Sequence, residues 1–115
     1  MANKKIGELS VVQLRGRRRR LARSLPAVEE TLRGTQLTQG RRCGKPGCRC
    51  ARGELHGPYS YFSLGRESGR GRLVYVPAAL VAVVGRRVEA SARIEAVLSE
   101  ISEINAELLR RRELE

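Results

Sequence analysis

The sequence contains no Asp and no Trp, a single His and few aromatic residues, with one Phe and three Tyr in 115 residues. In its central part the only carboxylates are Glu54 and Glu67, so no carboxylate pair for acid–base catalysis can be proposed. No nucleophile–base pair is visible either, and we therefore expect that the protein is not an enzyme. The scarcity of aromatic residues predicts a small aliphatic core, which in a domain this poor in core usually needs reinforcement, for example by a metal.

Long hydrophobic segments are also lacking. The longest apolar run, VPAALVAVVG, is about half the length of a membrane span. The N-terminal residues MANKKIGELS lack the apolar stretch of a secretory signal. We therefore expect a cytoplasmic protein without a membrane partner. Because cytosolic thiols stay reduced, three cysteines close together favour metal or redox chemistry over a disulfide framework.

Negative charge is scarce in the first two-thirds of the chain. The net charge is +11, and residues 1–77 carry 17 Lys and Arg against 5 Glu, whereas residues 78–115 have a net charge of −1. A GC-rich genome would explain the preference for Arg over Lys, but it would not explain this asymmetry. The distribution predicts a polyanionic partner, most simply a nucleic acid and in the first instance DNA.

Periodicity and turn residues predict an α+β fold with three segments: a basic helical segment over residues 1–33, a zinc-binding β unit over 34–77 and a long amphipathic helix over 78–115. We expect a first helix over residues 4–23 and a short second one from Ser24 to about Leu32, with Pro26 in its first turn. Residues 35–43, 59–64 and 72–77 alternate or are β-branched, as in strands. The fold expected is a small zinc-stapled antiparallel head, either a hairpin or three strands, with the N- and C-terminal helices forming a coiled-coil-like stem.

The long C-terminal helix carries an apolar stripe that a small head cannot cover. The candidate interface residues are Leu80, Val84, Ile94, Val97, Ile101, Ile104 and Leu108. Two partners are compatible with this stripe: the N-terminal helix, whose charge of +7 over residues 1–25 complements the acidic C-terminal helix, and a second copy of the chain. The two can coexist, and we expect a homo-oligomer or a helical partner protein.

All three cysteines and the only histidine lie in RRCGKPGCRCARGELHGPY, with the spacing C-x4-C-x-C-x5-H. Zinc binds four thiolate or imidazole ligands in a tetrahedron, so Cys43, Cys48, Cys50 and His56 predict one structural Zn²⁺ per chain. If Cys48 and Cys50 lie in an extended segment, both sulfurs face the same way. Neighbouring Arg side chains would favour the thiolates. Unrelated thiols, or a redox or iron–sulfur role, are the alternatives.

The same segment carries a family resemblance. The pattern C-G-K-x-x-C-x-C followed by H-G-P-Y falls on residues 43–50 and 56–59, and a strand pair and a long helix with ELLRR follow it. It resembles an uncharacterised prokaryotic family that is catalogued as a domain of unknown function, over about residues 25–112. Members are often associated with mobile elements, which implies DNA only by association.

Basic clusters supply the candidate nucleic-acid contacts, because guanidinium groups bind phosphate oxygens in pairs. They are Arg17, Arg18, Arg19, Arg20, Arg41, Arg42, Lys45, Arg49, Arg52, Arg70 and Arg72. Tyr59 and Tyr61 are candidates for stacking on unpaired bases. The N-terminal arginines could instead form the solvated, salt-bridged side of a helix, and the tyrosines could pack in the core or around the metal.

Two functions follow from these features. The first is a small nucleic-acid-binding accessory protein with a structural zinc site and helix-mediated dimerisation. The second is a protein–protein adaptor, or a subunit of a larger mobile-element or defence complex, that uses the long helix as its interaction surface. The charge distribution favours the first function, and the apolar stripe favours the second.

Overall fold

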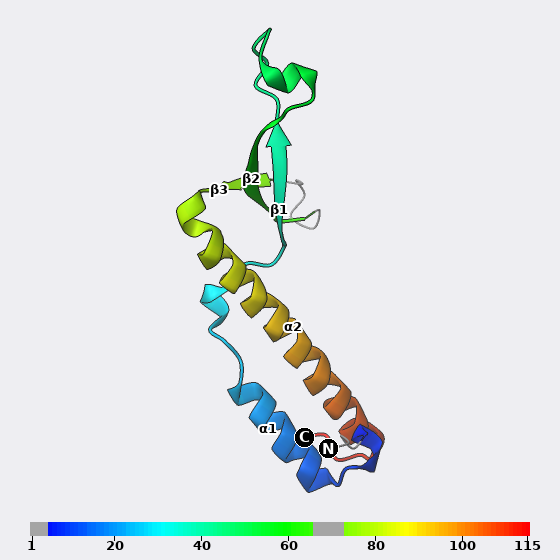
Figure 1. Ribbon diagram of the computed structural model, residues 1–115. Helices are drawn as coiled ribbons and strands as arrows, with labels where there is room; N and C mark the ends of the chain where they lie inside the picture. Colours follow the sequence, from blue (N-terminus) through cyan, green and yellow to red (C-terminus); the bar gives the residue numbers. More distant parts are fainter. Residues whose placement is uncertain (1–4, 66–72) are drawn as a thin grey trace. The chain divides into compact units, whose positions relative to one another are not determined.

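The computed structural model describes residues 5–65 and 73–115, which form an α+β fold (Figure 1). The elements are α1 (Val11–Arg23), β1 (Thr35–Arg41), β2 (His56–Ser63), β3 (Leu73–Val76) and α2 (Val81–Arg110), with short 3-10 helices between them. The chain divides into two compact units. The helical unit contains the chain up to Glu30 together with Ala92–Glu115, and the sheet unit is Thr31–Ser91. The terminal segments thus share one unit, and α2 contributes to both.

A capping box determines where α1 begins. The Ser10 hydroxyl accepts a hydrogen bond from the Gln13 backbone N–H (3.1 Å), and the Gln13 side chain accepts one from the Ser10 N–H (2.9 Å). The helix predicted over residues 4–23 therefore starts only at Val11. Before Ser10 the chain forms a single 3-10 turn, Ile6–Glu8.

The second short helix predicted from Ser24 to Leu32 is wrong. Ser24 does not begin a helix but ends α1, because its N–H and its hydroxyl both donate to the Leu21 carbonyl oxygen. Pro26 lacks an N–H and disfavours helical geometry at Leu25. Only one 3-10 turn forms, at Val28–Glu30, and Val28 is 72% exposed. The segment has little apolar burial to stabilise a longer helix.

The core of the helical unit joins α1 to the C-terminal half of α2. Leu14, Ile104 and Leu108 are fully buried, and four further side chains pack around them: Ile6, Leu9, Val11 and Leu21. Of the two partners that the sequence left open for the apolar stripe, the N-terminal helix covers its C-terminal half in the structure. Of the other interface candidates, Val97 is buried, Val84, Ile94 and Ile101 are half-buried, and Leu80 is 47% exposed.

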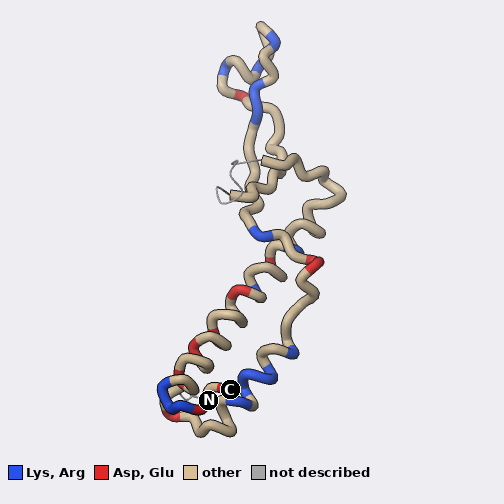
Figure 2. The backbone as a smooth tube through the Cα atoms, turned by 180° about the vertical axis from the view of Figure 1, so that it is seen from behind, with Lys and Arg blue, Asp and Glu red and all other residues tan. Residues whose placement is uncertain are grey.

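Charged residues of both signs occur on these two helices: in Figure 2, Lys and Arg positions (blue) follow α1 and acidic positions (red) recur along α2. Arg17 pairs with Glu100 (3.3 Å), and Arg18 donates to the Asn105 side chain (2.8 Å). The two helices run antiparallel, because Arg15 near the start of α1 reaches Glu113 while Ser24 at its end lies against Arg93. Each exposed ion pair contributes little to the free energy of unfolding. These contacts therefore determine which parts of α1 and α2 lie side by side more than they stabilise the helical unit.

The sheet unit is a three-stranded antiparallel sheet in the order β1-β2-β3. Phe62 and Val76 are buried on one face, which also carries Gln36, the register partner of Phe62. The Gln36 side chain donates to the Val81 carbonyl oxygen (3.1 Å), so the start of α2 lies against this face. As predicted, the long helix follows Pro77, through a 3-10 turn at Ala78–Leu80.

Gly34 precedes β1 where the chain passes close to β2. A Cβ atom there would overlap the Ser63 carbonyl oxygen and lie 2.6 Å from the Phe62 ring, so only glycine fits. Over the described residues, no helix is both long and apolar enough to cross a bilayer.

Candidate metal centre and basic loop

The four candidate ligands sit on the connection between β1 and β2, which we call the metal loop (residues 42–56). Cys43 follows β1, Cys50 lies in a 3-10 helix (Arg49–Arg52) and His56 opens β2. His56 pairs with Arg41 across the hairpin, after a bulge between Gln39 and Arg41. The strand ends therefore bring the two ends of the loop together.

Tight turns fold the rest of the loop back onto these ends. Gly44 and Gly47 have φ values of 73° and 83°, which side chains other than glycine rarely adopt. A turn hydrogen bond joins the Cys48 N–H to the Lys45 carbonyl oxygen (3.2 Å). The expectation that Cys48 and Cys50 share an extended segment is wrong, since Cys48 is the cap of the 3-10 helix that contains Cys50. Their sulfurs nevertheless converge on the same point.

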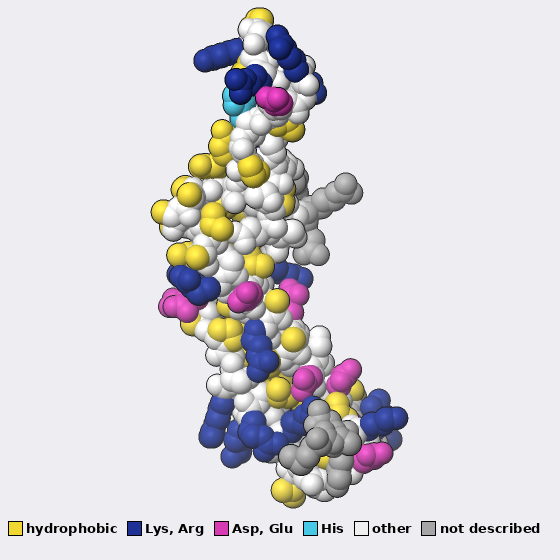
Figure 3. Space-filling model, viewed as in Figure 1, with side chains coloured by type: hydrophobic (Ala, Val, Ile, Leu, Met, Phe, Trp, Pro, Cys, Tyr) yellow, Lys and Arg dark blue, Asp and Glu magenta, His cyan; other side chains and the backbone are white. Residues whose placement is uncertain are grey.

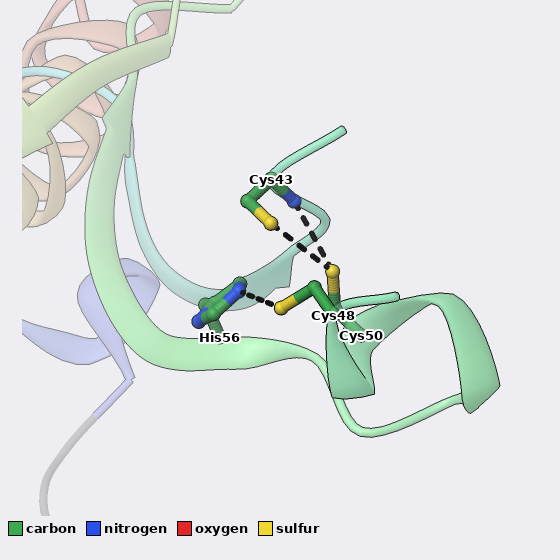
Figure 4. A group of neighbouring side chains, drawn as sticks. All are labelled: Cys43, Cys48, Cys50 and His56. Carbon is green, nitrogen blue, oxygen red and sulfur yellow. Dashed lines mark hydrogen bonds between the residues drawn. The ribbon is translucent and has the colours of Figure 1, made fainter. Parts of the chain in front are cut away.

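The ligand atoms of the four residues lie within 4.8 Å of one another (Figure 4). The sulfurs of Cys43 and Cys50 are 3.5 Å apart, and the Cys48 sulfur is 3.1 Å from His56 Nε2. A tetrahedral metal with bonds of about 2.3 Å to sulfur would separate two sulfurs by about 3.8 Å. All three cysteines are free thiols. The residues present thus fit a four-coordinate metal ion and could hold one.

Backbone N–H groups have the largest effect on the pKa values of Cys43 and Cys50. The Cys43 N–H donates to the Cys50 sulfur (3.3 Å) and, with the neighbouring thiols and His56, lowers the pKa of Cys50 to about 7 despite its burial. At Cys43 the Lys45 N–H favours the thiolate, but contacts with Cys48 and Cys50 together with burial leave its pKa raised. The sequence had pointed to arginines as the groups that favour thiolate, whereas at Cys43 and Cys50 the largest contribution that favours it comes from a backbone N–H.

Basic side chains surround the ligands. Arg42, Lys45, Arg49 and Arg52 are all exposed, and Glu54 is the only acidic residue in the loop. Figure 3 shows dark blue side chains gathered around the single histidine. Arg41, at the end of β1, donates from Nε to the Tyr61 hydroxyl (3.0 Å), and its guanidinium lies 4.5 Å from the centre of that ring.

The other candidate nucleic-acid contacts lie elsewhere. Arg17 and Arg18 are engaged by α2, as the salt-bridge alternative anticipated, whereas Arg19 and Arg20 on α1 are exposed. Arg70 and Arg72 fall outside the described residues. The arginines of α1 therefore belong to the helical unit, and those of the metal loop belong to the sheet unit.

The tyrosines form an aromatic group on the sheet and are not core residues. Tyr59 is 39% exposed and Tyr61 is half-buried. Sequence reasoning missed Tyr75, which is 54% exposed and lies directly opposite Tyr61 on β3. The alternation of LVYV could have indicated Tyr75. Side chains two residues apart in a strand share a face, so Leu73 and Tyr75 lie on one face of β3, and Val74 and Val76 lie on the other.

Comparison with known proteins gives one finding. No match was found among the curated proteins or among the solved structures. A family model matches residues 12–86, a span that contains α1 except its first residue, the sheet, all four candidate ligands and the start of α2. This is more than half of the chain. The chain therefore belongs to the family described as a domain of unknown function (DUF6788).

Proposed function

We propose that this protein is a small nucleic-acid-binding accessory protein in which the four ligands of the metal loop hold one structural Zn²⁺. Three thiolates and one imidazole are soft and borderline ligands of the kind zinc prefers. Four protein ligands fill a tetrahedral site and leave no position for a substrate. Such a site supports a structural role and not a catalytic one.

The metal loop has few apolar side chains, so a bound metal would be the main source of its stability. Of residues 42–56 only Cys50 is buried, and the single larger aliphatic side chain, Leu55, is 48% exposed. Apolar burial in this loop is too small to offset the conformational entropy that is lost when its backbone becomes ordered. Metal binding would supply that free energy, because the ligands converge only in the folded loop.

The observation that carries the nucleic-acid proposal is the uneven charge of the two units. The sheet unit contains 11 Lys and Arg against 3 Glu, a net charge of +8, whereas the rest of the chain contains 12 against 9, a net charge of +3. In the helical unit, Arg17 of α1 pairs with Glu100 of α2, and Arg15 pairs with Glu113, just after the end of α2. A zinc ion with three thiolates has a net charge of −1, so residues 41–56 still carry about +3. This surface suits a phosphate backbone.

The test is the salt dependence of binding to a fluorescent DNA duplex and to one of its strands. We compare a loop variant, Arg42→Gln, Arg49→Gln and Arg52→Gln, with a helix variant, Arg19→Gln, Arg20→Gln and Arg23→Gln. All six side chains are exposed, and each variant removes the same charge. Zinc content and the thermal melt of both variants are the controls for folding.

For the unmodified protein we expect a log–log slope of about −4 or steeper, which corresponds to four or five phosphate contacts. The loop variant should flatten that slope by about 2 to 3. The helix variant should leave it nearly unchanged. Equal losses in both variants would show that only overall charge matters. Absence of binding at about 0.1 M salt would overturn the proposal and favour a protein partner.

A further inference from the structure

Three tyrosines share one face of the sheet unit, and we call this the tyrosine face (Tyr59, Tyr61 and Tyr75). Tyr59 and Tyr61 alternate along β2, and Tyr75 pairs with Tyr61 in the register of β2 and β3. The Tyr75 ring makes edge-to-face contacts with both others, at centroid distances of 5.9 Å to Tyr61 and 6.3 Å to Tyr59. These contacts hold the rings as a group.

The two faces of the sheet are covered differently. The opposite face carries Phe62 and Val76, only 3% and 4% exposed, and the start of α2 lies against it. On the tyrosine face, Tyr59 and Tyr75 remain 39% and 54% exposed, so no described element of the sheet unit covers them. A cluster of solvent-exposed aromatic side chains is typical of a surface that binds a ligand or a partner.

Arg41 connects the tyrosine face to the metal loop. Its side chain lies over the Tyr61 ring and donates to the Tyr61 hydroxyl, while its backbone pairs with the metal-ligand candidate His56. Basic and aromatic groups are therefore contiguous within one unit. Proteins that bind single strands combine these two elements, a positive track for phosphates and rings for bases.

We propose that the tyrosine face binds single-stranded nucleic acid, with bases stacked on Tyr59 and Tyr75 and phosphates on the metal loop. This inference rests on the function proposed above and specifies its ligand. Because Arg41 already covers a face of Tyr61, Tyr61 acts as a positioning residue for that cation. Tyr59 and Tyr75 are the more exposed rings, and they are the ones that receive bases.

The orientation of the rings favours a single strand over a duplex. The Tyr59 and Tyr75 rings meet at an interplanar angle of 72°, with centroids 6.3 Å apart. Bases stacked on both rings are therefore steeply inclined to each other, whereas neighbouring bases in a duplex lie parallel, so both rings can be used only by a strand whose bases are unstacked. Bases inside a duplex are paired and present only their edges in the grooves.

The first test needs no variant. The chain has three tyrosines and no Trp, so its intrinsic fluorescence comes entirely from the tyrosine face. Titration with a thymidine oligonucleotide of about 15 nucleotides should quench this emission as it binds. A matched duplex, bound through the metal loop alone, should leave the emission nearly unchanged. Equal quenching by both, or by neither, would overturn the inference.

The second test uses paired substitutions. Tyr59→Leu and Tyr75→Leu remove a ring, whereas Tyr59→Phe and Tyr75→Phe keep it. Each Leu variant should weaken single-strand binding about fivefold or more, while the Phe variants should bind like the unmodified protein. Duplex binding should not change in any of them. The thermal melt of each variant shows whether the sheet is intact, and if a Leu variant fails to fold, the quenching titration of the unmodified protein still decides whether bases reach the rings.

The outcomes separate the two proposals. If neither DNA form binds, the proposed function fails and this inference fails with it. If the salt-dependent binding is present but the Leu variants bind both forms like the unmodified protein, the nucleic-acid function stands and the stacking role of the tyrosines is overturned. If the Leu variants lose duplex and single strand equally, the tyrosines support the fold and do not contact bases.

Discussion

At the scale of single residues, the chemistry of the metal loop depends on four side chains and on the backbone that presents them. All four were predicted from spacing alone, because cysteines clustered beside the single histidine in a chain with this composition have few other uses. The structure adds how His56 is positioned, as the first residue of β2, opposite Arg41. What spacing could not show is that a backbone N–H, that of Cys43, points at the Cys50 sulfur.

A pair of substitutions at His56 tests its role as a ligand. His56→Gln removes the imidazole and should lower the zinc content and the protection of the metal loop from hydrogen exchange. His56→Cys provides a thiolate, which zinc accepts equally well, and should keep both. Lys45→Gln is the control in the same loop. If both His56 variants retained zinc, this exposed histidine would not be a ligand.

At the scale of elements, the end of α2 is fastened to the start of the chain. Arg111 donates to the carbonyl oxygens of Leu9 (2.6 Å) and Gly7 (3.1 Å) and to the Glu107 carboxylate (2.7 Å). Its hydrogen bond with Glu107 and that of Arg110 lower the pKa of Glu107. The Arg111 guanidinium therefore holds the 3-10 turn before α1, and the Glu107 carboxylate orients that guanidinium.

This arrangement predicts an acid-sensitive helical unit. Because the pKa of Glu107 is lower in the folded state, its contribution to stability is present above its ordinary value of 4.5 and is lost as the pH falls through the lower folded value. Glu107→Gln should lower the melting temperature at neutral pH and change it little at about pH 3. Thermal melts followed by circular dichroism measure this. An equal difference at both pH values would contradict it.

Element boundaries show what sequence reasoning could and could not supply. The strands and the long helix were predictable because alternation and Pro77 leave clear local signals. The start of α1 was missed because the apolar pattern runs through Ser10, and only the capping contact with Gln13 reveals the break. The short helix after Ser24 was wrongly predicted because a serine before a proline resembles an N-cap, although Ser24 caps the preceding helix instead.

At the scale of the whole molecule, the N-terminal helix covers part of the stripe that suggested dimerisation. Apolar residues that α2 still exposes in the helical unit include Leu98 and Leu109, which are 62% and 61% exposed. They are eleven residues apart, about three helical turns, and so lie on nearly the same side of the helix. Dimerisation stays a prediction, and this side of α2 is where a second copy could pack.

Sedimentation of a double variant tests that prediction. Leu98→Ser with Leu109→Ser should convert a dimer to a monomer, because it removes apolar surface that only a second copy could bury. Val12→Ser, at a 79% exposed position on α1, is the control and should leave the dimer intact. A dimer that persists in the double variant would place the contact elsewhere, and a monomeric unmodified protein would refute the prediction.

The partition of charge also belongs to this scale. Positive charge in the helical unit is largely offset by acids of the same unit, whereas the sheet unit keeps its excess. Sequence alone located the asymmetry between residues 1–77 and 78–115, but it could not show which arginines meet acids. That depends on α1 packing against α2, a contact between segments more than 80 residues apart in the chain.

The central claim is that the metal loop is a folded zinc site, and its most direct test is the metal content of the reduced protein together with its response to a chelator. We predict one zinc per chain, and on chelation a loss of hydrogen-exchange protection in residues 42–56 and a lower melting temperature of the sheet unit. Well under one zinc per chain, with a melt that a strong chelator does not change, would contradict the account.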